Sequence, residues 1–182
     1  MISMTTWRSR GLRGDILEEI IHHANEYYRQ KHLGRVDKIS TPIKVVEIDS
    51  NKVITRAFFE KKSTVDFMGI IQGVGVAFDA KETSLKSLPL SNIHSHQMEF
   101  MRDINSQNGL AFIILHFKFC DEYYLVPYED LQTFYNNKDK RKSIPYKAMR
   151  SEFLLHISPQ GILDYLPGLN AYLDYKDAQK KT

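Results

Sequence analysis

The segment from Ser63 to Glu82 constrains the fold of this chain more than any other, because it combines acids, glycines and a short apolar run. It reads S-T-V-D-F-M-G-I-I-Q-G-V-G-V-A-F-D-A-K-E. Side chains alternate between the two faces of a β-strand, so Asp79 and Lys81 point the same way from an apolar strand. The same period places Thr64 and Asp66 on one face of a preceding strand. The intervening glycines favour a hairpin or meander, which would bring two carboxylates and an ammonium group together.

Two acids and a lysine in one small volume suit a divalent cation next to a phosphate group. Carboxylate oxygens are ligands that Mg²⁺ prefers. A lysine charge stabilises the negative charge that develops on the phosphoryl group in the transition state. The spacing D-x12-D-x-K resembles the PD-(D/E)xK nuclease signature. The alternative interpretation is an edge hairpin in which Asp79 and Lys81 form an exposed ion pair, worth roughly 0 to 1 kcal/mol.

The size and composition of the chain predict one globular domain. Its 182 residues, 42% of them hydrophobic, are enough to bury a core. The single cysteine, Cys120, excludes an internal disulfide and favours a reducing cytoplasm. We expect no secretion leader and no membrane span, since the sequence shows neither pattern.

The basic residues are clustered although the formal net charge is only +3. A cluster near the N-terminus contains Arg8, Arg10 and Arg13, within or beside an expected flexible basic tail at residues 1–12. A second cluster lies between 138 and 150, where Asp139 is the only acid among six basic residues. Clusters of this kind favour a polyanionic partner, while the alternative is a solvated loop and a frayed terminus.

The order of the expected elements predicts an α/β fold with a mixed sheet flanked by helices. Apolar residues recur with helical spacing in the first long segment, and Gly34 is expected to end that helix. Two alternating runs around a turn-rich tetrapeptide, 49–52, predict a hairpin spanning 43–60. Ser91 or Asn92 is expected to cap the second helix. The expected helices are 14–31, 93–106, 128–135 and a weakly amphipathic 163–172, and the expected strands are 43–48, 53–59, the two of the 63–82 segment, 110–117 and 123–127.

Several stretches together resemble the RecU family of bacterial Holliday junction resolvases, in the family's order and spacing over roughly residues 13 to 135. The segment 63–82 contributes S-T-V-D-F-M-G-I and F-D-A-K-E-T. The others are R-G-D-I-L-E at 13–18 with Tyr27-Tyr28 behind it, T-P-I-K-V-V at 41–46, and L-P-L-S-N-I-H-S-H-Q-M-E-F-M at 88–101.

The resemblance implies a dimeric, Mg²⁺-dependent endonuclease with a PD-(D/E)xK restriction-endonuclease-like core, which cuts four-way DNA junctions by paired symmetric nicks. Mn²⁺ is a candidate substitute for Mg²⁺. The hairpin 43–60 would be the family's stalk, which enters the open centre of the junction. The implied metal ligands are Thr64, Asp66, Asp79 and Gln97; the implied catalytic residues are Asp66, Asp79, Lys81 and the upstream acid Glu18.

The basic clusters and the basic surplus of the hairpin indicate where DNA would be bound. Residues i and i+2 of a helix point about 200° apart, so His94 and His96 are not expected to share a zinc ion. Gln97 becomes a metal ligand only through the family pattern. The expected DNA-binding residues are Arg10, Arg13, Lys44, Lys52, Arg56, Lys62, Lys140, Arg141 and Lys142.

Two further functions compete with junction cleavage. A branched-DNA-binding recombination mediator would bind junctions and modulate a RecA-type recombinase with weak or no cleavage. A restriction-type nuclease would read bases and select duplex sites, whereas junction recognition depends on shape and backbone contacts. For each of these functions we expect the protein to act on DNA in the cytoplasm, associated with the nucleoid, and not to bind a membrane.

Overall fold

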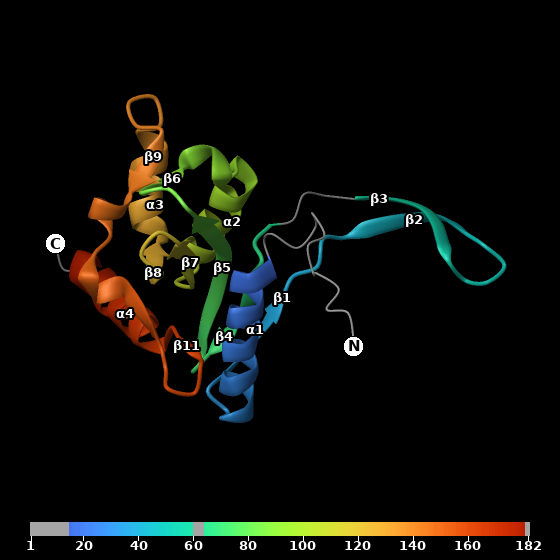
Figure 1. Cartoon of the computed structure of the whole chain (residues 1–182), viewed down its shortest axis with the longest axis horizontal. Helices are drawn as coiled ribbons and strands as arrows, with labels where there is room; N and C mark the ends of the chain where they lie inside the picture. The colour runs from blue at the N-terminus through green and yellow to red at the C-terminus, as the bar shows by residue number, and fades with distance from the viewer. Residues whose placement is uncertain (1–14, 60–63, 181–182) are drawn as a thin grey trace, which may run out of the picture.

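A mixed sheet of seven strands forms the body of the molecule, whose computed structural model describes residues 15–59 and 64–180 (Figure 1). The strand order is β1-β4-β5-β7-β8-β10-β11. Strands β5 and β7 run parallel, and helix α2 provides the crossover that a parallel pair requires. The strands of this sheet are β1 (Gly34–Lys38), β4 (Phe67–Ile71), β5 (Val74–Thr83), β7 (Leu110–Phe117), β8 (Glu122–Pro127), β10 (Leu154–Ile157) and β11 (Leu163–Asp164).

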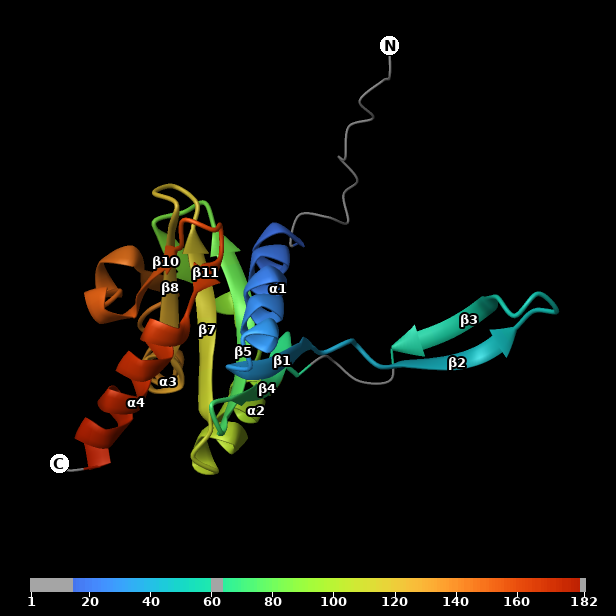
Figure 2. The same ribbon diagram turned by 90° about the horizontal axis from the view of Figure 1, so that it is seen from below.

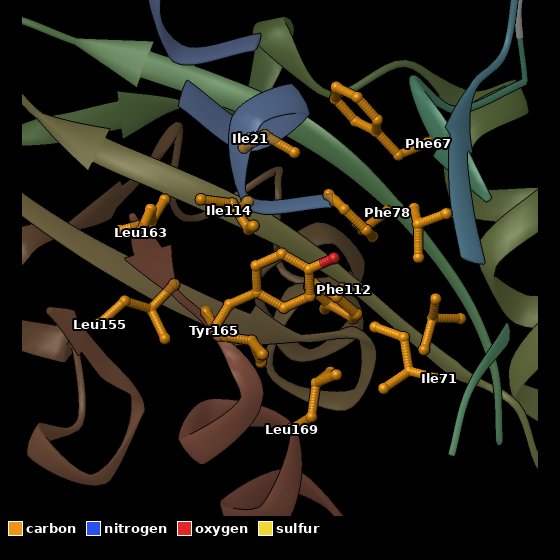
Figure 3. Close-up of a cluster of buried hydrophobic side chains, with 14 of the residues drawn as sticks. Ile21, Phe67, Ile71, Phe78, Phe112, Ile114, Leu155, Leu163, Tyr165 and Leu169 are labelled. Carbon is orange, nitrogen blue, oxygen red and sulfur yellow. The ribbon is translucent and has the colours of Figure 1, made fainter. Parts of the chain in front are cut away.

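Helices cover both faces of the sheet, and each face buries its own apolar cluster (Figures 1 and 2). On one face, under α1 and α4, Tyr165 packs in the same cluster as Phe78 and Phe112 (Figure 3). The other face packs against α2 and α3, which contribute Met101 and Leu131. The predicted mixed sheet flanked by helices is therefore confirmed. The helices are α1 (Asp15–Gln30), α2 (Ser95–Ser106), α3 (Tyr128–Asn136) and α4 (Leu166–Lys180), with short 3-10 turns η1 (Leu90–Asn92), η2 (Tyr146–Ala148) and η3 (Ser151–Phe153).

The predicted hairpin projects from this body as the two strands β2 (Ile43–Ile48) and β3 (Ile54–Phe59), as both views show (Figures 1 and 2). Every residue of both strands is exposed. Asp49 organises the turn, because its carboxylate accepts hydrogen bonds from the N–H groups of Asn51, at 2.8 Å, and Val53, at 2.9 Å. We call this hairpin the stalk.

The predicted pairing of the two strands in the 63–82 segment is also confirmed. Strands β4 and β5 form an antiparallel hairpin, and Gln72 and Gly73 turn the chain with φ angles of 48° and 84°. Gly69 has a different role, because a Cβ atom there would lie 2.0 Å from the carbonyl oxygen of Arg35. Only glycine permits β1 to pair this closely with β4.

Three expectations about local structure are wrong. The second helix begins at Ser95 and not at residue 93, since His94 has an extended backbone (φ −84°, ψ 151°) and is the N-cap. Gly34 does not end the first helix: His32 takes the left-handed conformation (φ 56°), and Gly34 opens β1. The last helix begins at Leu166 and not at residue 163, because Leu163 and Asp164 form a strand, and it continues to Lys180. Strands β1, β10 and β11 were not expected, nor was the small sheet of β6 (Ser87–Pro89) and β9 (Ser143–Pro145).

Candidate active site

Strand β5 presents Asp79 and Lys81 on the sheet face that packs against α2. Ala77, two residues earlier, belongs to the apolar cluster of that face, as the period of a strand requires. Asp79 is fully buried, and its Oδ2 forms an ion pair with Nζ of Lys81, whose side chain is 18% exposed. The lysine thus reaches the surface while its partner carboxylate does not. The interpretation as an exposed surface pair is therefore wrong.

Asp66 lies opposite Asp79 at the point where β4 begins. Its N–H donates to Oδ1 of Asp79 at 3.1 Å, and its Oδ2 accepts a hydrogen bond from the N–H of Ala80 at 2.9 Å. Burial, and next the nearby Asp79 carboxylate, raise the pKa of Asp66 to about 7. The two side chains are brought together as the sequence predicted.

The path of the chain into this site differs from the expected strand. Residues 64 to 66 are not paired in the sheet, and the chain bends at Asp66. Val65 packs on the α2 face and Phe67 on the α1 face, although a regular strand would place both on one face. The prediction that Thr64 and Asp66 share one strand face is therefore wrong; the crossed hydrogen bonds between Asp66 and the Asp79–Ala80 segment set the position of Asp66 instead.

Gln97, in the first turn of α2, connects the start of that helix to Asp79. Its Nε2 donates to Oδ2 of Asp79 at 2.7 Å, and its Oε1 accepts from the N–H of His94 at 3.0 Å. The second bond is the part of a capping box in which the side chain of the third helical residue accepts from the N–H of the N-cap residue. In this orientation the amide oxygen, which is the atom that could bind Mg²⁺, is directed to His94 and the amide nitrogen to Asp79.

The donor set fits a magnesium ion that keeps much of its water. In residues 15–59 and 64–180, no three His, Cys, Asp or Glu side chains converge to chelate a metal. Mg²⁺ is commonly bound by one or two carboxylates, with waters and substrate phosphates completing the shell. Asp66 and Asp79 supply two carboxylates, and Thr64, which the family resemblance implies as a hydroxyl ligand, is half-buried two residues before Asp66. Burial, and next the Asp79 carboxylate, raise the pKa of Asp66, and a bound cation would offset both effects by favouring the charged form.

Glu18 does not complete a cluster with these two aspartates. Its Oε2 accepts a hydrogen bond from Nζ of Lys38 at 2.5 Å, in an ion pair between α1 and β1. The helical spacing of α1 placed Leu17 and Ile21 in the core correctly, but spacing alone does not determine which neighbour a half-buried glutamate finds.

The expected DNA-binding residues lie at separate places on the surface. Lys44, Lys52 and Arg56 are exposed on the stalk, where Arg56 also pairs with Glu47 at 2.8 Å. Lys140, Arg141 and Lys142 are exposed in the loop between α3 and β9. Arg10, Arg13, Lys62 and the tail at residues 1–12 lie outside the described residues.

Sequence reasoning missed His94 as a structural partner of the site. The expectation that His94 and His96 both lie on a helix is wrong, because His94 precedes it; their rings stack at 5.4 Å with an interplanar angle of 10°. The signal that could have located the helix start is Gln97 itself, since Gln at the third helical position marks a capping box whose first residue is His94.

Comparisons with known proteins assign the family. The model of the family Recombination protein U (RecU) matches residues 12–171, and the chain belongs to this family. A Holliday junction resolvase RecU of Lactococcus lactis is 43% identical over 145 residues, which cover 77% of this chain and 68% of the relative. The protein of that name from Shouchella clausii is 38% identical over 178 residues, covering 93% and 85%.

A solved structure from an archaeon shows a partial likeness to this chain. It is Hjc, a Holliday junction resolvase of Archaeoglobus fulgidus, with a TM-score of 0.39 and 9% identity over 62% of this chain and 77% of the neighbour. Within residues 15–59 and 64–180, no helix combines the length and apolar character needed to cross a membrane.

Proposed function

We propose that this protein resolves Holliday junctions as a divalent-metal-dependent endonuclease that uses Mg²⁺, with Mn²⁺ as a substitute. The observation that carries the proposal is the buried ion pair of Asp79 with Lys81 beside Asp66, in a chain of the RecU family. Relatives that are 38 to 43% identical are named Holliday junction resolvases. Two carboxylates for a cation and an ammonium group for a phosphate are what metal-assisted phosphodiester hydrolysis requires.

Each residue of the site has a separate task in this proposal. Asp66 and Asp79 would hold the cation, with the Thr64 hydroxyl as a further oxygen ligand. When bound, the cation would lower the pKa of a coordinated water and neutralise charge on the phosphate. An ammonium group has three donors, and Asp79 occupies one donor of Lys81, so the others remain for a phosphate oxygen.

We propose that Gln97 orients Asp79 before the cation binds and serves as a metal ligand only afterwards. Its present hydrogen bonds orient Asp79 and direct the amide oxygen to His94 and away from a cation at Asp79. Ligation through the oxygen requires the amide to rotate by about 180°, which breaks both bonds. A cation would lower the cost of that rotation, because it replaces the amide nitrogen as the partner of Asp79.

Glu18 is proposed as an upstream acid that acts only after a rearrangement. Its carboxylate is engaged with Lys38 at 2.5 Å. A DNA phosphate near β1 would compete for Lys38 and release Glu18 toward the site. The ion pair is half-exposed, so breaking it costs on the order of 1 kcal/mol or less.

The stalk supports recognition of a branched substrate by a homodimer. An isolated two-stranded hairpin is marginally stable in water, and this one exposes large apolar residues such as Phe59 at 76% and Ile48 at 60%. A second copy could cover them. Two-fold symmetry would then place two metal sites for paired symmetric nicks. The family resemblance adds a RecA-type recombinase as a proposed partner and the cytoplasmic nucleoid as the place of action.

DNA contacts are proposed from the basic residues of the stalk and of the 138–142 loop. Contacts to phosphates position the protein without reading sequence, which suits a substrate recognised by its branch point. The proposed set is Lys44, Lys52, Arg56, Lys140, Arg141 and Lys142, with Arg10, Arg13 and Lys62 outside the described residues.

A synthetic four-way junction with Mg²⁺ tests the proposal. We expect paired nicks in opposing strands, no cleavage in EDTA, and little cleavage of a linear duplex of the same sequence. Lys81→Ala should bind the junction and fail to cut it. Tight junction binding with no cleavage by the unaltered protein in Mg²⁺ or Mn²⁺ would refute the nuclease and favour a recombination mediator.

A further inference from the structure

A cavity of about 660 Å³ lies between the start of α2 and the loop that follows α3. One wall is formed by residues from 89 to 95 and the other by residues from 135 to 142. The loop stands above α3 and β9, at the same end of the molecule as α2 (Figure 1). Asp66, Asp79 and Lys81 do not line this cavity, so it is distinct from the proposed metal site.

Backbone hydrogen bonds hold the basic loop against the other wall. The N–H of Leu90 donates to the carbonyl oxygen of Lys142 at 2.9 Å, beside the pairing of β6 with β9. Within the loop, the N–H of Arg141 donates to the carbonyl oxygen of Asn137, also at 2.9 Å. These hydrogen bonds fix the backbone that bears the lysines of the loop. They favour a defined basic surface at 138–142 over the alternative of a solvated loop.

The cavity combines an apolar wall with a wall that is aromatic and mainly cationic. Leu90 and Ile93 are 6% and 3% exposed, and the ring of Tyr135 adds an aromatic surface. Lys138 and Lys142 line the same wall as Tyr135, together with the acid Asp139, and Nζ of Lys138 lies 4.7 Å from the centroid of the Tyr135 ring. A ligand with a planar ring and a negative charge fits this combination, because rings stack on aromatic side chains while phosphate binds lysine.

The same basic run lines a second, smaller cavity. Its volume is about 420 Å³, and Lys140 and Arg141 line it together with Phe134. Four cations of one short loop are therefore divided between two neighbouring hollows. A strand with a phosphate at every nucleotide can use both at once, whereas a single small ligand uses only one.

The first turn of α2 connects the larger cavity to the metal site. His94 and Ser95 line the cavity, and Gln97 in the same turn holds Asp79. A DNA strand whose phosphate lies at Asp79 and Lys81 would therefore cross this turn to reach the cavity.

We propose that the cavity binds one nucleotide of a DNA strand, with its base against Tyr135 and a phosphate on Lys138 and Lys142. The nucleotide is unpaired, because a base in a duplex could not enter a hollow in the protein surface. Branch points and single-stranded ends are where such nucleotides occur. This inference rests on the proposed function for its DNA substrate but not for cleavage.

The first test measures binding without chemistry. The full-length protein, in EDTA, is titrated with a fluorescent single-stranded oligothymidylate at several salt concentrations. The double variant Lys138→Ala/Lys142→Ala should bind on the order of tenfold more weakly, and its salt slope should fall by roughly 0.7 for each phosphate that it no longer neutralises. The matched control is Lys147→Ala/Lys180→Ala, which removes the same charge from exposed residues outside the cavity. Equal affinity and slope in the two double variants would overturn the proposal.

The second test locates the base. An oligonucleotide with one 5-iodouracil is crosslinked by light and the attachment site is identified by mass spectrometry; we expect it at Tyr135. Tyr135→Leu should lose the crosslink and keep the salt slope of the unaltered protein. A crosslink that forms at other residues and persists in Tyr135→Leu would refute the position of the base. If free thymidine monophosphate saturates the cavity of the unaltered protein but not of the lysine variant, the cavity would be reassigned to a free nucleotide.

The two proposals can fail independently. Junction cleavage by the unaltered protein, with no effect of the lysine pair on binding, refutes the nucleotide cavity alone. Loss of binding in the lysine variant, with no junction cleavage by the unaltered protein in any divalent cation, refutes the nuclease alone.

Discussion

Replacing Asp66 with asparagine should stabilise the protein in the absence of a divalent cation. Asp66 is buried next to Asp79, and its pKa is raised from an ordinary 3.8 to about 7. In the folded state the protonated form of Asp66 is therefore favoured more strongly than in the unfolded chain. In Asp66→Asn the amide oxygen can still accept from the N–H of Ala80, and the amide nitrogen can donate to Asp79, so repulsion is replaced by attraction.

The size of this effect depends on pH in a defined direction. Below pH 3.8 the carboxyl is protonated in both the folded and the unfolded chain, so the variant gains nothing. Between pH 3.8 and about 7 the unfolded chain releases its proton and the folded chain retains it, so the stability contributed at this site falls as pH rises. Above pH 7 the full cost of about 4 kcal/mol applies to the unaltered protein and is absent from the variant.

Urea unfolding in EDTA, followed by far-ultraviolet circular dichroism, measures the difference. We expect Asp66→Asn to be more stable than the unaltered protein by about 1 to 2 kcal/mol at about pH 5 and by about 4 kcal/mol at about pH 8. Adding Mg²⁺ at the higher pH should stabilise the unaltered protein and reduce the gap, because the cation binds the folded state.

The matched control is Asp37→Asn, a carboxylate with the opposite environment. Asp37 is exposed and hydrogen-bonded to Arg35, which lowers the pKa of the Asp37 carboxyl. Its replacement should not stabilise the protein at any pH. An Asp66→Asn variant that is equally or less stable than the unaltered protein at about pH 8 in EDTA would refute the account of a carboxylate whose charge is disfavoured by burial and by Asp79.

Three further predictions concern the proposed activity. Asp79→Asn should abolish junction cleavage and leave junction binding within a few-fold, measured by gel shift; near-normal cutting would contradict the site. Junction affinity should fall linearly with salt on a logarithmic scale, by roughly 0.9 units per phosphate contacted, and a flat response would argue against DNA as the ligand. Shortening the stalk to a tight turn between Lys44 and Phe59 should leave the fold intact, because all its residues are exposed, and remove most of the preference for junctions over duplex; an unchanged preference in a folded dimer would refute its role.

The sequence predicted the parts of the fold in which one strong pattern acts alone. The apolar run of β7 and the turn-rich hairpin of the stalk needed no information from the rest of the chain. Strand β1 could not be found this way, since only Val36 of its five residues is buried and its pairing depends on the close approach at Gly69. Strands β6, β9, β10 and β11 have two to four residues each, too few for an alternating pattern to appear.

The site was predictable where it follows strand geometry and unpredictable where it follows side-chain hydrogen bonds. Asp79 and Lys81 share a face because β5 is regular. Asp66 lies in a bend of the chain that crossed hydrogen bonds stabilise. The alternation of apolar and polar residues in the sequence does not indicate such a bend. The direction of the Gln97 amide depends on His94 and Asp79 together, which lie on different elements and meet only in the folded chain.

The position of Gln97 between the helix start and Asp79 makes a backbone proton a reporter of the site. The N–H of His94 is protected from exchange with solvent as long as Oε1 of Gln97 accepts its hydrogen bond. Should a cation draw that oxygen away, the amide of His94 would exchange faster when Mg²⁺ is added, whereas it would stay protected if Gln97 only orients Asp79. Hydrogen exchange followed by nuclear magnetic resonance could thus detect metal binding through the amide of His94, which is not itself one of the proposed metal ligands.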